Sequence, residues 1–235
     1  MKGRLTKIGI FALFIILATG FVVAQPIGVD NITAETSSRY NDTSTPVAIE
    51  AQAGNVTELS IVGLSVTRNW QGFYGNITGS IILADSAGNN FYDWNVSTPT
   101  GQVYASRNNS VSWTSVGCAL PADITAEELF LGHDDTAPDS VTNTFAASDH
   151  PSFLVGGTSI TEDACPSTQA YDSTGGQNNA FYQVLLNAGG DLIYTTVIED
   201  TTPSGFNEQP WHFQLLVGEP GTGSTTSYFF YLELQ

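Results

Sequence analysis

The feature that most constrains the fold is an alternation of apolar and polar residues that recurs in short segments along most of the chain. In residues 77–83, Ile77, Ile81 and Leu83 alternate with polar or small residues, as in a β-strand with one buried face. Turn-forming residues separate such segments at intervals of about 8–12 residues. The segments are 59–66, 77–83, 92–96, 103–105, 111–113, 141–145, 153–155, 158–161, 181–186, 192–198, 213–217 and 227–234. The pattern predicts an all-β fold, a single antiparallel β-sandwich of about ten short strands with an Ig-like or jelly-roll-like arrangement.

Two hairpins are expected within this pattern. The clearest joins residues 181–186 to 192–198, because the Ala-Gly-Gly sequence at 188–190 supplies a tight turn. A second is expected between 103–105 and 111–113, where polar residues separate two apolar segments. The sequence has no internal repeat of fixed period, which disfavours a solenoid or a propeller.

One short helix is predicted near residues 126–131. Thr125 and Glu128 have the spacing of a capping box, and Pro121 lies just upstream. Gly132 follows the last apolar residues and is a typical helix terminator. The prediction is therefore one or two helical turns within an otherwise all-β domain.

The sequence divides into three predicted regions. Residues 1–24 begin with a basic segment and continue as an uncharged, largely apolar run. This arrangement is typical of a secretory signal peptide, and a retained N-terminal anchor helix is the open alternative. Both place the rest of the chain outside the cell. Residues 25–57, rich in Ser, Thr and Asn, are predicted to form an arm or linker, and residues 58–235 the β-sandwich domain.

The charge balance argues against several classes of partner. The chain has 23 acidic and six basic residues, a net charge of −17. Beyond residue 24 its cations are Arg39, Arg68 and Arg107. Binding of nucleic acid and docking on anionic lipid both need clustered cations, and a phosphate-binding Gly-rich loop often carries a Lys. We therefore expect no nucleic-acid or nucleotide partner, and membrane contact only through residues 8–24 if the leader is retained.

Cys118 and Cys165 are the two cysteines of the chain and are predicted to form one disulfide. An even number of cysteines in an exported protein is typical of disulfide bonding, and two buried free thiols are the alternative. Neither cysteine has a second Cys or a His at the spacing of a zinc site, so this pair is not expected to bind metal.

Acceptors for N-glycosylation, of the form Asn-x-Ser/Thr, are concentrated in the first half of the chain. They stand at Asn31, Asn41, Asn55, Asn76, Asn95 and Asn108. Asn76 and Asn95 fall on the polar side of their predicted strands, where a glycan has room. We expect a glycosylated first half of the chain, and the alternative is a Ser/Thr-rich composition without glycan.

No sequence motif identifies an enzyme. The chain lacks the Gly-x-Ser-x-Gly pentad of a nucleophile elbow, and His133, His150 and His212 are isolated from one another. A catalytic triad assembled only in space is not excluded by sequence. Adjacent carboxylates are expected to be solvated surface charges, because neighbours on a strand point to opposite faces. These pairs are Glu127–Glu128, Glu162–Asp163 and Glu199–Asp200. We predict no catalytic residues, no resident cofactor and no enzymatic activity.

Two groups of residues are candidates for ligand binding. Asp134, Asp135 and Asp139 lie within six residues and could supply oxygen ligands to Ca²⁺, the alternative being an exposed acidic loop. Trp70 and Trp211 are candidates for stacking on sugar rings, and the alternative for both is packing in the core.

Four segments carry a resemblance to known proteins. They are residues 70–79 (Trp-Gln-Gly-Phe-Tyr-Gly-Asn-Ile-Thr-Gly), 103–107, 213–219 and 228–234. Together they resemble archaeal secreted cell-surface proteins, which are β-rich and of uncharacterised function. The resemblance covers most of the chain after the leader. It implies an archaeal, extracellular protein and transfers no functional residue.

These observations predict an extracellular structural protein, a subunit of a filament or envelope layer that assembles by strand exchange. The inserted strand would be residues 47–51 or 59–66, adding to an open sheet edge of a neighbour. The expected partners are further copies of the chain or other envelope proteins. The alternative is a secreted carbohydrate- or calcium-binding β-sandwich module, with glycans as partners.

Overall fold

The computed structural model describes residues 25–41, 43 and 45–235, so the predicted leader at 1–24 lies outside the described residues. The fold is mostly β, with 33% strand and 10% helix. The strands are β1 (Ile27–Gly28), β2 (Trp70–Gly75), β3 (Gly79–Ala84), β4 (Asn90–Val96), β5 (Gly101–Ser106), β6 (Val116–Cys118), β7 (Phe153–Val155), β8 (Thr158–Ile160), β9 (Ser167–Gln169), β10 (Tyr182–Ala188), β11 (Asp191–Val197), β12 (Phe213–Gly218) and β13 (Phe229–Leu234). The helices are α1 (Pro121–Leu131) and α2 (Val141–Thr144), with 3₁₀ turns at Trp113–Ser115 and Phe206–Glu208.

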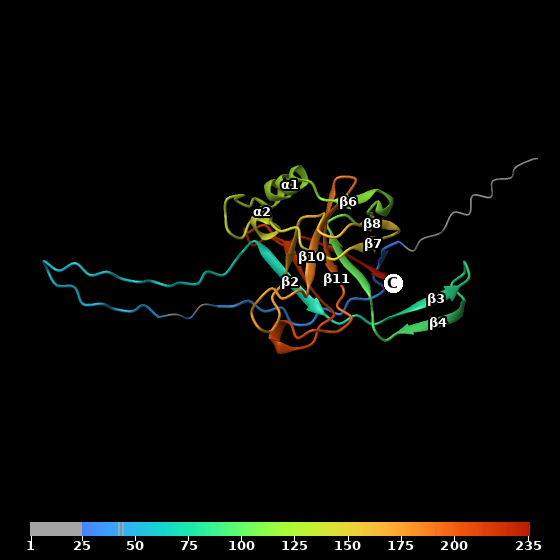
Figure 1. Cartoon of the computed structure of the whole chain (residues 1–235), viewed down its shortest axis with the longest axis horizontal. Coiled ribbons are helices and arrows are strands. Elements are labelled where there is room, and N and C mark those ends of the chain that lie inside the picture. The colour runs from blue at the N-terminus through green and yellow to red at the C-terminus, as the bar shows by residue number, and fades with distance from the viewer. Residues whose placement is uncertain (1–24, 42, 44) are drawn as a thin grey trace, which may run out of the picture.

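A seven-stranded antiparallel sheet lies at the centre of the molecule (Figure 1). Its order is β1-β13-β5-β11-β10-β6, and β9 also pairs with β10. The predicted hairpin of β10 and β11 is confirmed, with Ala188 opposite Asp191 across the turn. Every residue of β5 is buried, because the strand has neighbours on both edges and packing on both faces.

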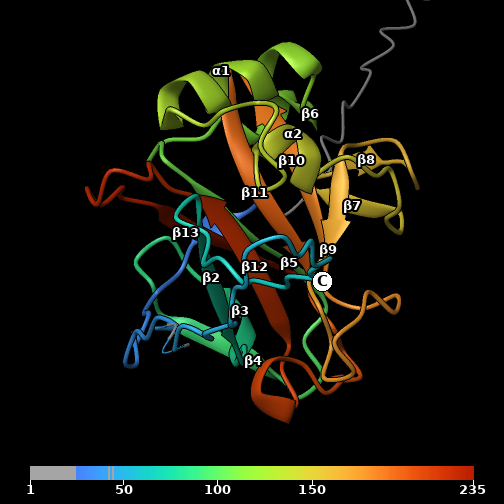
Figure 2. The same ribbon diagram turned by 90° about the vertical axis from the view of Figure 1, so that its left-hand side faces the viewer.

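A two-stranded sheet, β2 paired with β12, covers one face of the central sheet (Figure 2). Leu215 and Val217 of β12 are buried in a cluster with Tyr194 of β11. Phe73 of β2 packs edge-on against Phe230 of β13, with ring centroids 5.2 Å apart. The opposite face of the central sheet is covered by β7 and β8 and by aromatic residues that include Trp113.

The expected antiparallel β class is therefore confirmed, while the strands do not form a single closed sandwich. They divide into the central sheet and three two-stranded sheets, of which β3–β4 extends away from the body of the molecule (Figure 1). The hairpin turn at residues 85–89 is held by Asp85, whose carboxylate accepts N–H bonds from Ala87 and Asn89.

Three sequence predictions about local structure were wrong. Residues 141–145 contain helix α2, not a strand, because Ser140 caps it by accepting the Asn143 N–H. Residues 111–113 do not pair with β5, whose two edges are occupied by β11 and β13. Residues 59–66 are exposed or half-buried and form no strand.

The predicted helix is longer than expected and begins earlier. Pro121 is its first residue, and the Asp123 carboxylate accepts the N–H of Leu120, so the cap lies one turn before the predicted one. Gly132 ends the helix in a left-handed conformation, as predicted. Thr125 donates to the Pro121 carbonyl instead of capping.

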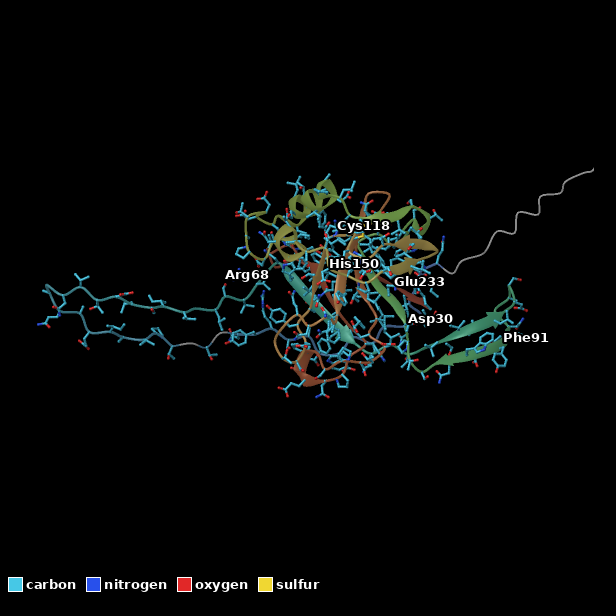
Figure 3. The ribbon with its side chains drawn as sticks, in the orientation of Figure 1. Asp30, Arg68, Phe91, Cys118, His150 and Glu233 are labelled. Atoms are coloured by element: carbon cyan, nitrogen blue, oxygen red, sulfur yellow. A yellow bond between two sulfur atoms is a disulfide. The ribbon has the colours of Figure 1, made fainter. Side chains whose placement is uncertain are left out.

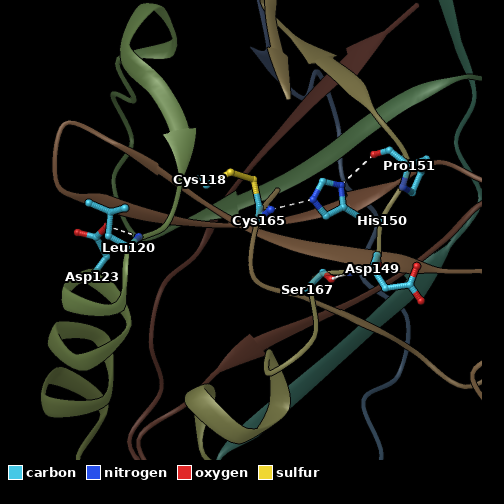
Figure 4. Close-up of a disulfide and its surroundings, with 8 residues drawn as sticks. All are labelled: Cys118, Leu120, Asp123, Asp149, His150, Pro151, Cys165 and Ser167. Atoms are coloured by element: carbon cyan, nitrogen blue, oxygen red, sulfur yellow. Dashed lines mark hydrogen bonds between the residues drawn. A yellow bond between two sulfur atoms is a disulfide. The ribbon is translucent and has the colours of Figure 1, made fainter. Parts of the chain in front are cut away.

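The structure contains the predicted disulfide between Cys118 and Cys165 (Figure 4). Cys118 ends β6, and Cys165 precedes β9; both strands pair with the same edge of β10. Cys165 is fully buried, and its N–H donates to Nε2 of His150 over 3.0 Å. The disulfide therefore fastens two short edge strands side by side along β10.

Candidate assembly surface

The outer edge of β2 is open. Glu219 N donates to Asn69 O, in register with the β2–β12 pairing, so the odd-numbered residues of β2 hydrogen-bond to β12. The N–H and C=O groups of Trp70, Gly72 and Tyr74 then point away from β12. Among the described residues none of these groups has a backbone partner, although a side-chain amide from Gln71 reaches the Gly72 carbonyl.

The other edge of this two-stranded sheet is blocked. On β12, the outward N–H of Leu216 donates to the side chain of Gln183, a buried residue of β10, over 2.6 Å. The Gln214 side chain accepts the N–H of Phe206 and donates to the Tyr171 carbonyl. An added strand can therefore pair with this sheet only along β2.

A half-buried apolar surface lies beside that open edge. Phe230, Leu232 and Leu234 alternate along β13 and face the same side of the central sheet as the β2–β12 layer. They are only partly buried because β2 is the last strand of the covering layer on that side. A further strand paired with β2 would cover them.

A long exposed segment, residues 29–69, is named here the extended loop. Its described residues form no helix or strand, and it projects from the body to a turn at Gln52–Asn55 (Figure 1). The stretch 59–67 is uncharged, and Val62 and Leu64 within it are 95% and 80% exposed. The loop therefore presents apolar residues with the spacing of a strand and no sheet to pair with.

The β3–β4 hairpin has a second exposed apolar surface. Ile81 lies opposite Trp94 and Leu83 opposite Tyr92, which confirms the predicted alternation in both strands. All four side chains are exposed, however, where sequence reasoning expected the apolar side of a strand to face a core. The rings of Tyr92 and Trp94 pack against each other in a tilted arrangement, with centroids 4.8 Å apart.

His212 ties the start of this hairpin to the rest of the sheet. Its Nδ1 accepts the N–H of Ile77 over 3.0 Å, and Ile77 is buried between β2 and β3. Burial lowers the pKa of His212, so the ring accepts this bond in its neutral form. The connection from β2 to the hairpin is therefore fixed by a hydrogen bond that protonation would remove.

The structure places five of the six glycosylation acceptors on the exposed surface. Three lie on the extended loop and two flank or belong to the hairpin: Asn31, Asn41, Asn55, Asn76 and Asn95. Asn108 is half-buried, and its amide donates to Asp191 over 2.7 Å. Whether any of them carries a glycan stays a prediction.

The three aspartates proposed for calcium do not converge. Asp134 accepts from the N–H and hydroxyl of Thr136, which lowers the pKa of its carboxyl, and Asp139 accepts from Thr67 over 2.6 Å. Within the described part of the chain, no group of three or more His, Cys, Asp or Glu side chains could hold a metal ion.

The two tryptophans proposed for sugar stacking have different environments. Trp70 belongs to the core cluster, where it packs against Phe145 and Tyr194 and donates its indole N–H to the Asp139 carbonyl. Trp211 is half-buried, and its ring centroid lies 5.0 Å from that of exposed Tyr74, which is itself 4.8 Å from that of exposed Phe206. Of the two, only Trp211 therefore lies beside exposed aromatic side chains.

The expectation that adjacent carboxylates are solvated was wrong for Glu127 and Glu128. Glu127 is buried, pairs with Arg107 and accepts from the Tyr194 hydroxyl. Glu128 is buried and accepts the Thr142 N–H at the start of α2. Both lie on α1 and connect it to neighbouring elements, so their role is structural. Both fall in the predicted helix, where alternation between strand faces does not apply, and their burial depends on partners far away in sequence such as Arg107 and Tyr194.

Comparison with known proteins finds no matching protein family, no similar curated protein and no similar solved structure. None of the helices in the described residues is long and apolar enough to cross a membrane.

Proposed function

We propose that this chain is an extracellular structural protein, of archaeal cell-surface type, that polymerises into a filament or envelope layer by strand exchange. In each contact, residues 59–66 of one copy add as a strand to the outer edge of β2 in the next copy. The inserted strand completes the second layer of a two-layer β-sandwich that the isolated chain leaves open. Other envelope proteins with a similar strand are further partners under this proposal.

The single observation that carries the proposal is that one chain contains both an open strand edge, at β2, and a separate segment with the pattern of a strand that pairs with nothing in the described part of that chain. The β2 edge offers unpaired backbone groups above a half-buried apolar face, and the extended loop offers apolar side chains at alternate positions. An exposed edge of this kind is normally blocked in a monomeric protein, as the opposite edge is blocked here by Gln183 and Gln214.

The net charge of the chain favours association through backbone hydrogen bonds and apolar contacts over association through ion pairs. With a net charge of −17, two copies repel each other through most of their surface. The donor stretch 59–67 contains no charged residue, and the acceptor side chains Phe230, Leu232 and Leu234 are apolar. The disulfide and the export signal predicted at 1–24 both support an extracellular location.

The test is the double substitution Val62→Asp/Leu64→Asp in the chain from Gln25 onward. Burying each of the two native side chains contributes about 1.5–3 kcal/mol. The variant should therefore need at least about a hundredfold higher concentration to assemble, by sedimentation. Both residues are exposed in the monomer, so thermal unfolding should not change.

The matched control is Ser37→Asp/Ser38→Asp, which adds two charges to exposed positions of the same loop. It should assemble nearly as the wild type does. Assembly of the Val62→Asp/Leu64→Asp variant at the wild-type concentration would contradict the proposal, and so would a wild-type chain that stays monomeric at every concentration.

The exposed aromatic group favours a second candidate function, a carbohydrate-binding module. Tyr74, Phe206 and Trp211 present adjacent rings at the surface, an arrangement that can stack on sugars. Binding to a glycan array that is lost on Trp211→Ala would support this function. Absence of binding across polysaccharides would count against it.

A further inference from the structure

The β3–β4 hairpin is held to the body of the molecule at its base, through Ile77 and Gly79, and receives no comparable support along the rest of its length. Among the residues that the structure describes, its two strands pair only with each other, and the hairpin extends from the body beyond the end of β2, as the labelled Phe91 near its tip shows (Figure 3). A two-stranded hairpin without packing on either face is marginally stable in water. A sequence that keeps such a hairpin apolar therefore points to a partner that covers it.

One face of the hairpin is suited to that contact and the other is not. The first face carries Ile81, Leu83, Tyr92 and Trp94, with the two aromatic residues 57% and 50% exposed. On the opposite face, Ser80 lies across from Asn95, a glycosylation acceptor, and Ile82 lies across from Asp93. The polar residues mark the second face as the solvent side and leave the first for a protein partner.

The hairpin follows directly after β2, the strand whose outer edge is open. Three residues connect the end of β2 to the start of β3, and His212 fixes this connection through Ile77. A strand that pairs along β2 and continues past Gly75 therefore meets the hairpin next. Figure 1 also shows the hairpin and the extended loop projecting at opposite ends of the molecule.

Contacts between opposite ends are heterologous, so they repeat from copy to copy and build an open polymer unless the rotation between copies closes a ring. The partner must also be compatible with the charge of the chain. The apolar face of the hairpin has no charged side chain, and the stretch 59–67 of the extended loop has none either. Contact between these two surfaces brings no acidic groups of the two copies together.

We infer that the apolar face of the β3–β4 hairpin is a second docking surface, which packs on the end of the uncharged stretch 59–67 of a neighbouring copy where that stretch passes Gly75. This inference rests on the proposed function and names a further part of the same interface. The hairpin then acts as a flap over the inserted chain, and its aromatic pair becomes buried on assembly.

The experiment uses the monomeric Val62→Asp/Leu64→Asp chain as recipient, because its own donor strand is disabled and its β2 edge is intact. The probe is a fluorescent peptide of residues 56–68, and binding is measured by anisotropy. In this background we compare Tyr92→Ser/Trp94→Ser with the matched control Ile82→Ser/Phe91→Ser, which changes exposed apolar residues outside the apolar face.

The peptide should bind the recipient and its matched control equally, and the Tyr92→Ser/Trp94→Ser variant at least about tenfold more weakly. Equal binding to all three recipients would overturn the hairpin inference and leave strand exchange standing. Failure of the peptide to bind any recipient would overturn strand exchange by residues 59–66, and the hairpin inference with it. Circular dichroism of each recipient checks that the central sheet is unchanged.

Discussion

The open edge of β2 can be blocked by one substitution, Gly72→Pro. Gly72 lies opposite Leu216 at a position whose N–H and C=O point away from β12. Proline there removes a donor that an incoming strand needs and leaves the β2–β12 hydrogen bonds in place. The backbone of Gly72 is not left-handed, and a Cβ at this position would come no closer than 3.9 Å to Leu216.

The expected magnitude follows from these contacts. The lost hydrogen bond contributes about 0.5–1.5 kcal/mol, and the proline ring obstructs the approach of the added strand. The concentration needed for assembly should rise at least about tenfold, while the free energy of unfolding should change by about 1 kcal/mol or less.

Gly72→Ala is the matched control, because alanine fits the same space and keeps the N–H. Sedimentation velocity across a concentration series measures assembly, and urea unfolding measures stability. If Gly72→Pro and Gly72→Ala assemble at the same concentration, the reasoning that makes the β2 edge the acceptor is refuted.

Two further predictions concern the stability of the monomer. Cys118→Ser/Cys165→Ser opens a link between residues 47 apart in sequence and should cost about 4 kcal/mol, lowering Tm by roughly 10 °C in a calorimeter; an unchanged Tm would contradict this role of the disulfide. Because burial lowers the pKa of His212, the unfolded chain takes up a proton at a higher pH than the folded chain does. The stability of the wild type relative to His212→Asn should therefore fall as the pH drops below about 6.5, and a difference that stays constant from pH 7.5 to pH 5 would argue against the His212–Ile77 bond.

Local sequence patterns correctly predicted those strands that pair with the next segment along the chain. The β10–β11 hairpin, the β3–β4 alternation, the Gly132 helix end and the disulfide all follow from residues close in sequence or from a cysteine count. These features are set by turn chemistry and period-two alternation, which a single sequence displays.

The features that the sequence did not predict depend on contacts between residues far apart in the chain. Residues 59–66 have a strand pattern and form no strand, because a strand also needs an edge to pair with and this segment projects from the body without reaching one in the described part of its own chain. Trp70 and Trp211 look alike in sequence, and only the packing of Phe145 and Tyr194 around Trp70 separates their roles. The sequence of β2 does not show that its outer edge is open, because an open edge depends on whether another strand lies beside it in the fold.

Residue-resolved hydrogen exchange, on the monomer and on the assembled protein, tests strand exchange most directly. The amides of Trp70, Gly72 and Tyr74 and those of residues 59–66 should exchange fast in the monomer and become protected together on assembly. Polymers in which these amides exchange as fast as in the monomer would contradict the account.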